Sequence, residues 1–208
     1  MRNSVGLFIY GVFYVSVSKT NINNRTTSAI LCRCRNGDYI SWRNYTDTLE
    51  KVYGINYVFH PHGGVPACCE IAPIMGHGNK YIIDLYRRKA KEAQEEFGEW
   101  YKSIWNATAD FCESLYKDSD AIIDENDDFF SALWNVNQVI CLGLSFGDVD
   151  VPYLDRIQYE VRPETKWMIY YHSEDDLKRL KGVLGITGIS RKFEVYFLKS
   201  DNFWDRWK

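Results

Sequence analysis

An almost continuous apolar run at 139–146 (VICLGLSF) constrains the fold more than any other feature of this sequence. Its length suits a β-strand. A strand without polar alternation is typical of the centre of a parallel sheet, where helices cover both faces. Shorter apolar segments at 38–43, 56–59, 166–171 and 192–198 alternate with segments of helical character. The sequence therefore predicts an α/β fold with a Rossmann-like, mainly parallel sheet.

The longest predicted helix covers residues 81–116. Apolar side chains recur in it at steps of three and four residues and charged side chains fill the other face, which is the pattern of a helix with one buried face. The side chains expected to be buried are Ala93, Phe97, Trp100 and Ile104, and those expected in water are Glu92, Glu95, Glu96 and Glu99. With a second helix at 127–135, it forms a long helical insertion at about 81–136.

The composition is that of a folded domain, because 46% of the 208 residues are hydrophobic and 25% are charged. The net charge of −3 gives no sign of the basic surface with which proteins bind nucleic acids. The apolar run at 5–17 is shorter than the roughly 20 residues of a membrane helix, and most basic residues follow it. We therefore expect a buried strand or strand pair there. We also expect a cytoplasmic protein without a membrane or nucleic-acid partner.

The cysteines predict neither disulfides nor a metal site. A chain of this length and apolar content needs no covalent staples, and it has no cleavable-signal pattern. Neither Cys32-x-Cys34 nor the adjacent pair Cys68 and Cys69 has the two-residue spacer of a zinc knuckle. We expect reduced thiols at all six cysteines, which are Cys32, Cys34, Cys68, Cys69, Cys112 and Cys141.

Two polar motifs directly follow predicted strands. The first, Asn44-Tyr45-Thr46-Asp47, follows 38–43, and side chains at such a position face the ligand crevice of an open α/β sheet. The second, His60-Pro61-His62-Gly63-Gly64, follows 56–59 and combines imidazoles that titrate near neutral pH with glycines that let a ligand approach the backbone. Helix capping for the first and a simple turn for the second remain open as structural explanations.

Two glycine-containing segments complete the candidate set. Gly76-His77-Gly78-Asn79 is either a loop over a pocket or an ordinary glycine turn. In the segment 142–150 (LGLSFGDVD), Gly143 allows close approach of a phosphate or ribose. Ser145 can donate a hydrogen bond to phosphate, and Asp148 or Asp150 can accept one from ribose hydroxyls. A serine hydrolase is a weaker alternative, because the candidate histidines precede Ser145 in the chain.

Asn44, His62 and Ser145 each follow a predicted strand. The carboxyl ends of parallel strands share one edge of the sheet, so these three side chains are expected to converge on one polar ligand. The alternative is scatter, in which each side chain has only a local structural role.

The order of the motifs resembles that of a known family. ISWRNYTDTLEKVYG at 40–54, HPHGGV at 60–65, GHGNK at 76–80 and ICLGLSFGDVDVPYLDRI at 140–157, followed by KWMIYYHSEDDLKRL at 166–180, look like successive motifs of the AbiH bacteriophage abortive infection family. The resemblance covers about 38–199, with Trp42-Arg43 where a Phe usually precedes the Asn. It implies a role in antiviral defence.

A weaker likeness extends to the sirtuin-like domains of bacterial NAD-hydrolysing defence proteins. That likeness implies catalytic roles for Asn44 and His62. It implies a nucleotide-binding role for the remaining site residues, which are Thr46, Asp47, Gly63, Gly143, Ser145 and Asp148.

The amino-terminal part departs from the family pattern. AbiH proteins usually begin with a strand and a glycine turn, roughly G-N-G-F-D, before a helical insert, and residues 1–36 match none of it. We therefore expect 1–37 to be a divergent or truncated amino-terminal segment and 38–208 to be the AbiH-like α/β domain. Loss of a phosphate-binding glycine loop would affect activity directly.

The resemblance favours an anti-phage protein that binds, and as an NAD⁺ nucleosidase-like enzyme hydrolyses, a nucleotide such as NAD. Asn44 would orient the ribose or the attacking water, His62 would be the general base, and the loop from Ser145 to Asp148 would hold ribose and phosphate. The alternatives are a non-catalytic nucleotide-binding sensor or toxin partner, and an inactive fragment. A small nucleotide is the expected ligand. A second copy of the chain and a phage-derived trigger are further candidate partners.

Overall fold

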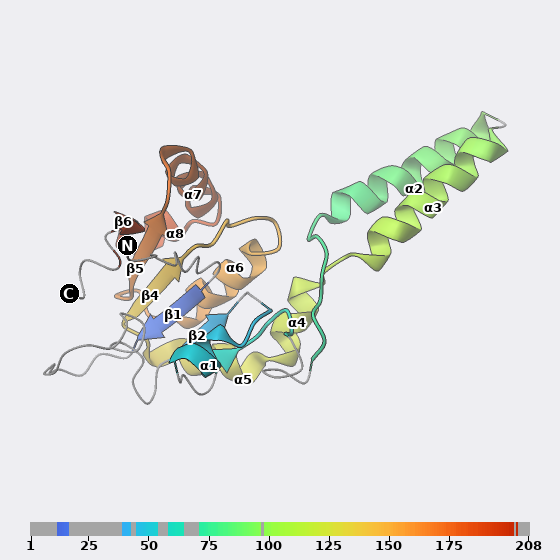
Figure 1. Ribbon diagram of the computed structural model, residues 1–208. Helices are drawn as coiled ribbons and strands as arrows, with labels where there is room; N and C mark the ends of the chain where they lie inside the picture. The colour runs from blue at the N-terminus through green and yellow to red at the C-terminus, as the bar shows by residue number, and fades with distance from the viewer. Residues whose placement is uncertain are drawn as a thin grey trace, which may run out of the picture.

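The computed structural model describes residues 12–16, 39–42, 45–53, 58–64, 71–96, 98–201 and 203 (Figure 1). In this part of the chain six strands form one sheet in the order β3-β2-β1-β4-β5-β6. The strands are β1 (Val12–Ser16), β2 (Tyr39–Trp42), β3 (Val58–Phe59), β4 (Gln138–Leu142), β5 (Lys166–Tyr171) and β6 (Val195–Lys199). The helices are α1 (Thr48–Tyr53), α2 (Lys80–Glu95), α3 (Glu99–Ser114), α4 (Ser119–Glu125), α5 (Asp127–Ser131), the 3₁₀ helix η1 (Ala132–Asn135), α6 (Val151–Glu160), α7 (Glu174–Ile186) and α8 (Ile189–Lys192).

Five of the six strands run in the same direction. β2 pairs in parallel with β3, and β4, β5 and β6 pair in parallel with one another. β1 lies between β2 and β4 and is antiparallel to both, so β2 and β4 also point the same way. The prediction of a mixed α/β fold with a mainly parallel sheet is confirmed. A strand is also confirmed within 5–17, at Val12–Ser16, and the rest of that segment lies outside the described residues.

Two strand boundaries were predicted wrongly. The apolar run at 139–146 is a strand only as far as Leu142, because Gly143 takes a left-handed φ of 67° and turns the chain out of the sheet. The following residues Leu144 and Phe146 are buried all the same. The segment at 192–198 begins as the end of helix α8, and its strand starts at Val195.

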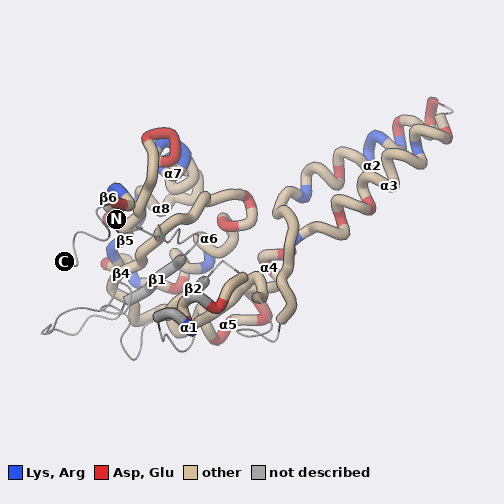
Figure 2. The backbone as a smooth tube through the Cα atoms, in the orientation of Figure 1, with Lys and Arg blue, Asp and Glu red and all other residues tan. Residues whose placement is uncertain are grey.

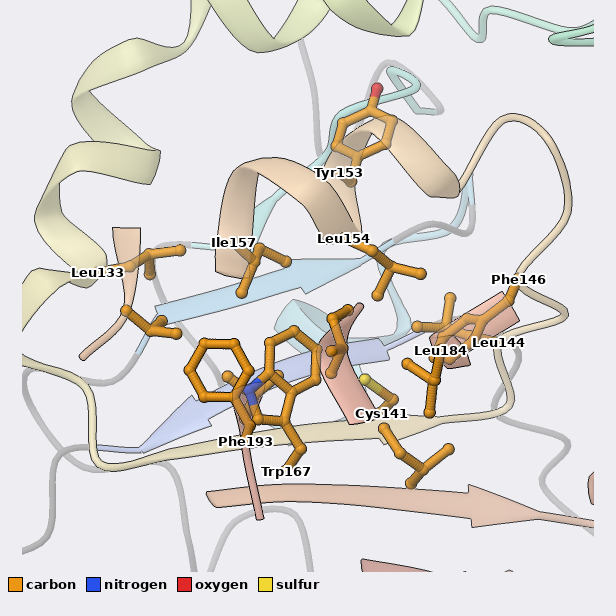
Figure 3. Close-up of a cluster of buried hydrophobic side chains, with 14 of the residues drawn as sticks. Leu133, Cys141, Leu144, Phe146, Tyr153, Leu154, Ile157, Trp167, Leu184 and Phe193 are labelled. Carbon is orange, nitrogen blue, oxygen red and sulfur yellow. The ribbon is translucent and has the colours of Figure 1, made fainter. Parts of the chain in front are cut away.

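The core lies between the sheet and helices α6, α7 and η1 (Figure 3). Trp167 of β5 is fully buried and packs against Phe193, with ring centroids 5.6 Å apart. Cys141 of β4 also lies in this cluster. Burial raises the pKa of its thiol, and the nearby carboxylate of Asp150 acts in the same direction. Cys141 and Cys112 are free thiols, and the other four cysteines lie outside the described residues.

The predicted long helix at 81–116 is instead a hairpin of two helices, α2 and α3, that projects from the body of the molecule (Figure 1). α2 ends where the backbone N–H of Gly98 donates to the carbonyl of Ala93 at 2.8 Å, and α3 begins at the next residue. Hydrophobic periodicity has the same spacing in one long helix as in two joined helices. The reversal therefore leaves little trace in the pattern.

The predicted burial of the apolar face was also wrong. Trp100 is 78% exposed and Ile104 46% exposed, while Ala93 is half-buried and Phe97 lies outside the described residues. The two helices pack instead through Tyr86, which stacks on Trp105 with ring centroids 5.7 Å apart, and through the buried Ala90 and Ala109. The four glutamates at 92, 95, 96 and 99 are exposed, as predicted.

Within the described residues, no helix has both the length and the apolar content needed to cross a membrane. The same part of the chain contains no group of three or more His, Cys, Asp or Glu side chains that could hold a metal ion.

Candidate functional site

The loop after β3 is anchored at both of its ends. His60 is buried, and its Nε2 lies 2.6 Å from Oε1 of Glu50 on α1. The N–H of Gly64 donates to the carbonyl of Ile71, and the N–H of Ile74 donates to the carbonyl of His62. These contacts tie the turn at 60–64 to the segment 71–74. His60 thus has a structural role that joins the turn to α1.

Gly63 is required by this arrangement. Its φ is +67°, and a Cβ at this position would lie 2.3 Å from the carbonyl oxygen of Ala72. Another residue would be strained by the backbone angle and would also collide with the neighbouring segment. The glycine therefore serves close packing between two loop segments.

His62 packs against α6 and is only 6% exposed. Its ring meets that of Tyr153 edge-on, with centroids 5.8 Å apart and planes at 77°. Tyr153 lies in the first turn of α6 and is buried, and in Figure 3 its side chain points away from Leu154 and Trp167. The contact brings the loop after β3 beside the helix that follows β4, although β2 and β1 lie between those two strands.

A buried lysine, which the sequence did not reveal as a site residue, lies beside the first motif. Lys117 is 6% exposed, and its Nζ donates to the hydroxyl of Tyr45 at 2.9 Å. That hydroxyl donates in turn to the carbonyl of Ile74 at 3.0 Å. The segment after β2 is thereby connected to the loop at 71–79 and to the segment before α4. A lysine in a polar stretch carries no pattern that predicts its burial.

The Gly76–Asn79 segment closes the base of the α2–α3 hairpin. The N–H of His77 donates to the carbonyl of Leu115, and the carbonyl of His77 accepts from the N–H of Lys117, both at 2.9 Å. A Cβ on Gly76 would lie 1.8 Å from the carbonyl oxygen of Leu115. Asn79 caps α2 through a hydrogen bond from the N–H of Ile82. Of the two roles considered for this segment, these contacts support a structural turn.

The loop after β4 is held by Asp150. One carboxylate oxygen of Asp150, which is buried, accepts from the N–H of Gly147 at 3.2 Å and from the hydroxyl of Ser145 at 3.4 Å. Phe146 takes a left-handed φ of 51°, which is unusual for a residue other than glycine, and its side chain is buried. Ser145 and Asp148 are exposed. Asp150 therefore fixes the loop, and Asp148 is open to solvent.

The loop after β4 also contacts the segments around it. The hydroxyl of Ser119 donates to the carbonyl of Val149 at 3.1 Å. Gly78 approaches Val149 so closely that a Cβ would lie 2.9 Å from its backbone nitrogen. The loops after β3 and β4 and the base of the hairpin thus form one connected region at the carboxyl edge of the sheet.

The remaining predicted site residues have separate surroundings. Asp47 is half-buried directly before α1, and its carboxylate lies 2.5 Å from Nζ of Lys51. Thr46 and Gly143 are exposed. Asn44 lies outside the described residues, so the convergence of Asn44, His62 and Ser145 stays a prediction.

The fold and this region define a mixed α/β protein in which polar, glycine-containing loops follow strands of a mainly parallel sheet. A family model described as bacteriophage abortive infection AbiH matches residues 12–171, and the chain belongs to this family. The match includes β1, which lies outside the motifs at 40–180. No curated protein and no solved structure matches the chain.

Proposed function

We propose that this protein acts in abortive infection by binding a nucleotide such as NAD at the carboxyl edge of a Rossmann-like sheet and hydrolysing it in the cytoplasm. The observation that carries the proposal is the packing of His62 on Tyr153. It brings the loop after β3 to the start of α6, next to the loop after β4. Ligands of open α/β sheets bind between such loops.

The loop after β4 supplies the groups that would hold the ligand. The exposed hydroxyl of Ser145 can donate to a phosphate oxygen, and the exposed carboxylate of Asp148 can accept from ribose hydroxyls. Gly143 is exposed and keeps a side chain away from the ligand path, and Gly63 allows the close packing that positions the loop after β3. Thr46 and Asp47 extend the polar edge. Because Asp150 holds the loop in place, the loop would lose little conformational entropy when the ligand binds.

The proposed reaction is hydrolysis of the bond between nicotinamide and ribose. Water forms a bond to the ribose C1′, and nicotinamide leaves with the electron pair of the broken bond. His62 accepts the proton of the water, and Asn44 orients the ribose or the water. No step requires a metal ion.

A non-catalytic sensor or toxin partner is the second candidate function. The observation that favours it is the 6% exposure of His62, because a general base must reach the attacking water. In this case the same loops would bind the nucleotide without turnover.

The test measures NAD binding by calorimetry and nicotinamide release by chromatography. We expect His62→Ala to lower release by roughly 100-fold or more, and Asp148→Asn to weaken binding by about tenfold, the effect of one hydrogen bond to a charged group. Lys166→Ala is the control, because Lys166 is exposed at the amino end of β5, at the opposite edge of the sheet from the proposed site. The melting temperature of each variant separates loss of activity from loss of fold.

The possible outcomes lead to different conclusions. Binding without release in the wild-type protein would assign the site to a sensor. Absence of NAD binding would contradict the proposal, as would full nicotinamide release by the His62→Ala variant.

A further inference from the structure

The outer face of α3 carries an apolar stripe, and no other part of the described chain covers it. Trp100 is 78%, Ile104 46% and Phe111 64% exposed, and Ala107 between them is also exposed. At 100° per residue these four side chains lie within about 60° around the helix axis and extend over roughly 16 Å. We call these four residues the α3 stripe.

The α3 stripe does not belong to the packing between α2 and α3. The side chains that face α2 are Trp105, stacked on Tyr86, and the fully buried Ala109. They lie on the opposite side of α3 from the stripe. The hairpin projects from the body, so the sheet and its helices do not approach the stripe either (Figure 1).

The exposed area is larger than a surface helix of a monomer normally shows. The exposed parts of Trp100, Ile104 and Phe111 amount to roughly 400 Å² of surface, given the size of these side chains. Monomeric proteins rarely expose a contiguous apolar patch above a few hundred Å². With Ala107 and the rim, two such faces would bury about 1,000 Å² together, which is the lower limit of a specific interface.

We propose that the α3 stripe is a homodimer interface in which two copies of this chain pair their α3 helices in antiparallel orientation. The spacing of the stripe is complementary to itself in this orientation. Trp100 of one copy lies opposite Phe111 of the other, and Ile104 lies opposite Ala107. Each central isoleucine therefore meets the smallest side chain of the stripe, which lets the helix axes approach closely at the two-fold axis.

The charges around the stripe are compatible with this pairing. The stripe itself contains no charged residue, and Ser103 and Ser114 flank it. Positively charged residues (Lys and Arg) and negatively charged residues (Asp and Glu) are both distributed along α2 and α3 (Figure 2). On the hairpin, Arg87 is already paired with Asp110 and Glu113. A second copy would bury the stripe without removing an unpaired charge from water, and antiparallel helix dipoles oppose each other favourably.

The test is sedimentation equilibrium of the full chain from about 1 to about 100 µM, the range that detects weak and moderate dimers. We expect the wild-type protein to reach about twice its monomer mass of 24.4 kDa. Ile104→Glu should raise the dimer dissociation constant at least tenfold. Ile186→Glu is the matched control, because Ile186 is 85% exposed at the end of α7, and this variant should dimerise like the wild type.

Three results would overturn the proposal: a wild-type protein that stays monomeric, an Ile104→Glu variant that dimerises unchanged, and an Ile186→Glu variant that is equally weakened. A monomer that cosediments with phosphatidylcholine vesicles would assign the stripe to a lipid surface instead and would also overturn it. Circular dichroism checks the helix content of each variant. If the Ile104→Glu variant loses helix content, Phe111→Glu at the carboxyl end of the stripe replaces it in the test. An unchanged dimer dissociation constant in that variant would overturn the proposal.

Discussion

At Gly63 the absence of a side chain allows two loop segments of the candidate site to pack closely together. We predict that Gly63→Ala lowers the free energy of unfolding by about 1–3 kcal/mol, because the new Cβ would meet the carbonyls of Ile71 and Ala72 at a left-handed φ. Urea unfolding measures the change. Gly185→Ala is the control: Gly185 lies in α7 with nothing within 4 Å of a Cβ, so alanine there should leave stability unchanged or raise it by up to roughly 1 kcal/mol. Equal effects of the two substitutions would contradict the tight packing at Gly63.

At the scale of elements, the α2–α3 hairpin is the part that depends least on the rest of the molecule. Its two helices pack on each other, and its base is closed by the backbone hydrogen bonds of His77 with Leu115 and Lys117. We predict that replacing residues 80–114 by a short Gly-Ser linker lowers the melting temperature by less than about 4 °C. The reason is that the core cluster contains no residue of either helix.

Far-UV circular dichroism should show the lost helix in this variant, while near-UV dichroism should retain the signal of the buried Trp167. A variant that loses the near-UV signal would show that the hairpin is needed to fold the sheet.

At the scale of the whole molecule, stability is concentrated where β4 and β5 meet the helices. We predict that Trp167→Ala lowers the free energy of unfolding by about 3–5 kcal/mol, because it leaves a large cavity in a fully buried position. The same substitution at Trp134, which is exposed and contacts the guanidinium of Arg162, should cost about 1 kcal/mol or less. Guanidinium unfolding of both variants tests the prediction, and similar losses in both would argue against this core.

Several features of the molecule are determined by local sequence. The apolar run at 139–146 predicted a central strand, and β4 lies inside the sheet between β1 and β5. Ser173 caps α7 through the N–H of Asp176, as expected for a serine before three acidic residues. Such features follow from the sequence because a strand buried on both faces must be apolar and because a cap acts within one turn.

Only the tertiary structure decided how these elements meet. Trp100 is exposed because no other described segment covers it. The antiparallel position of β1 between β2 and β4 depends on contacts between segments far apart in the chain. The same is true of the site: the packing of His62 on Tyr153 and the burial of Lys117 beside Tyr45 join residues 91 and 72 positions apart. A periodic pattern shows that a face is apolar. Which surface covers that face depends on free energies of packing that no single segment contains.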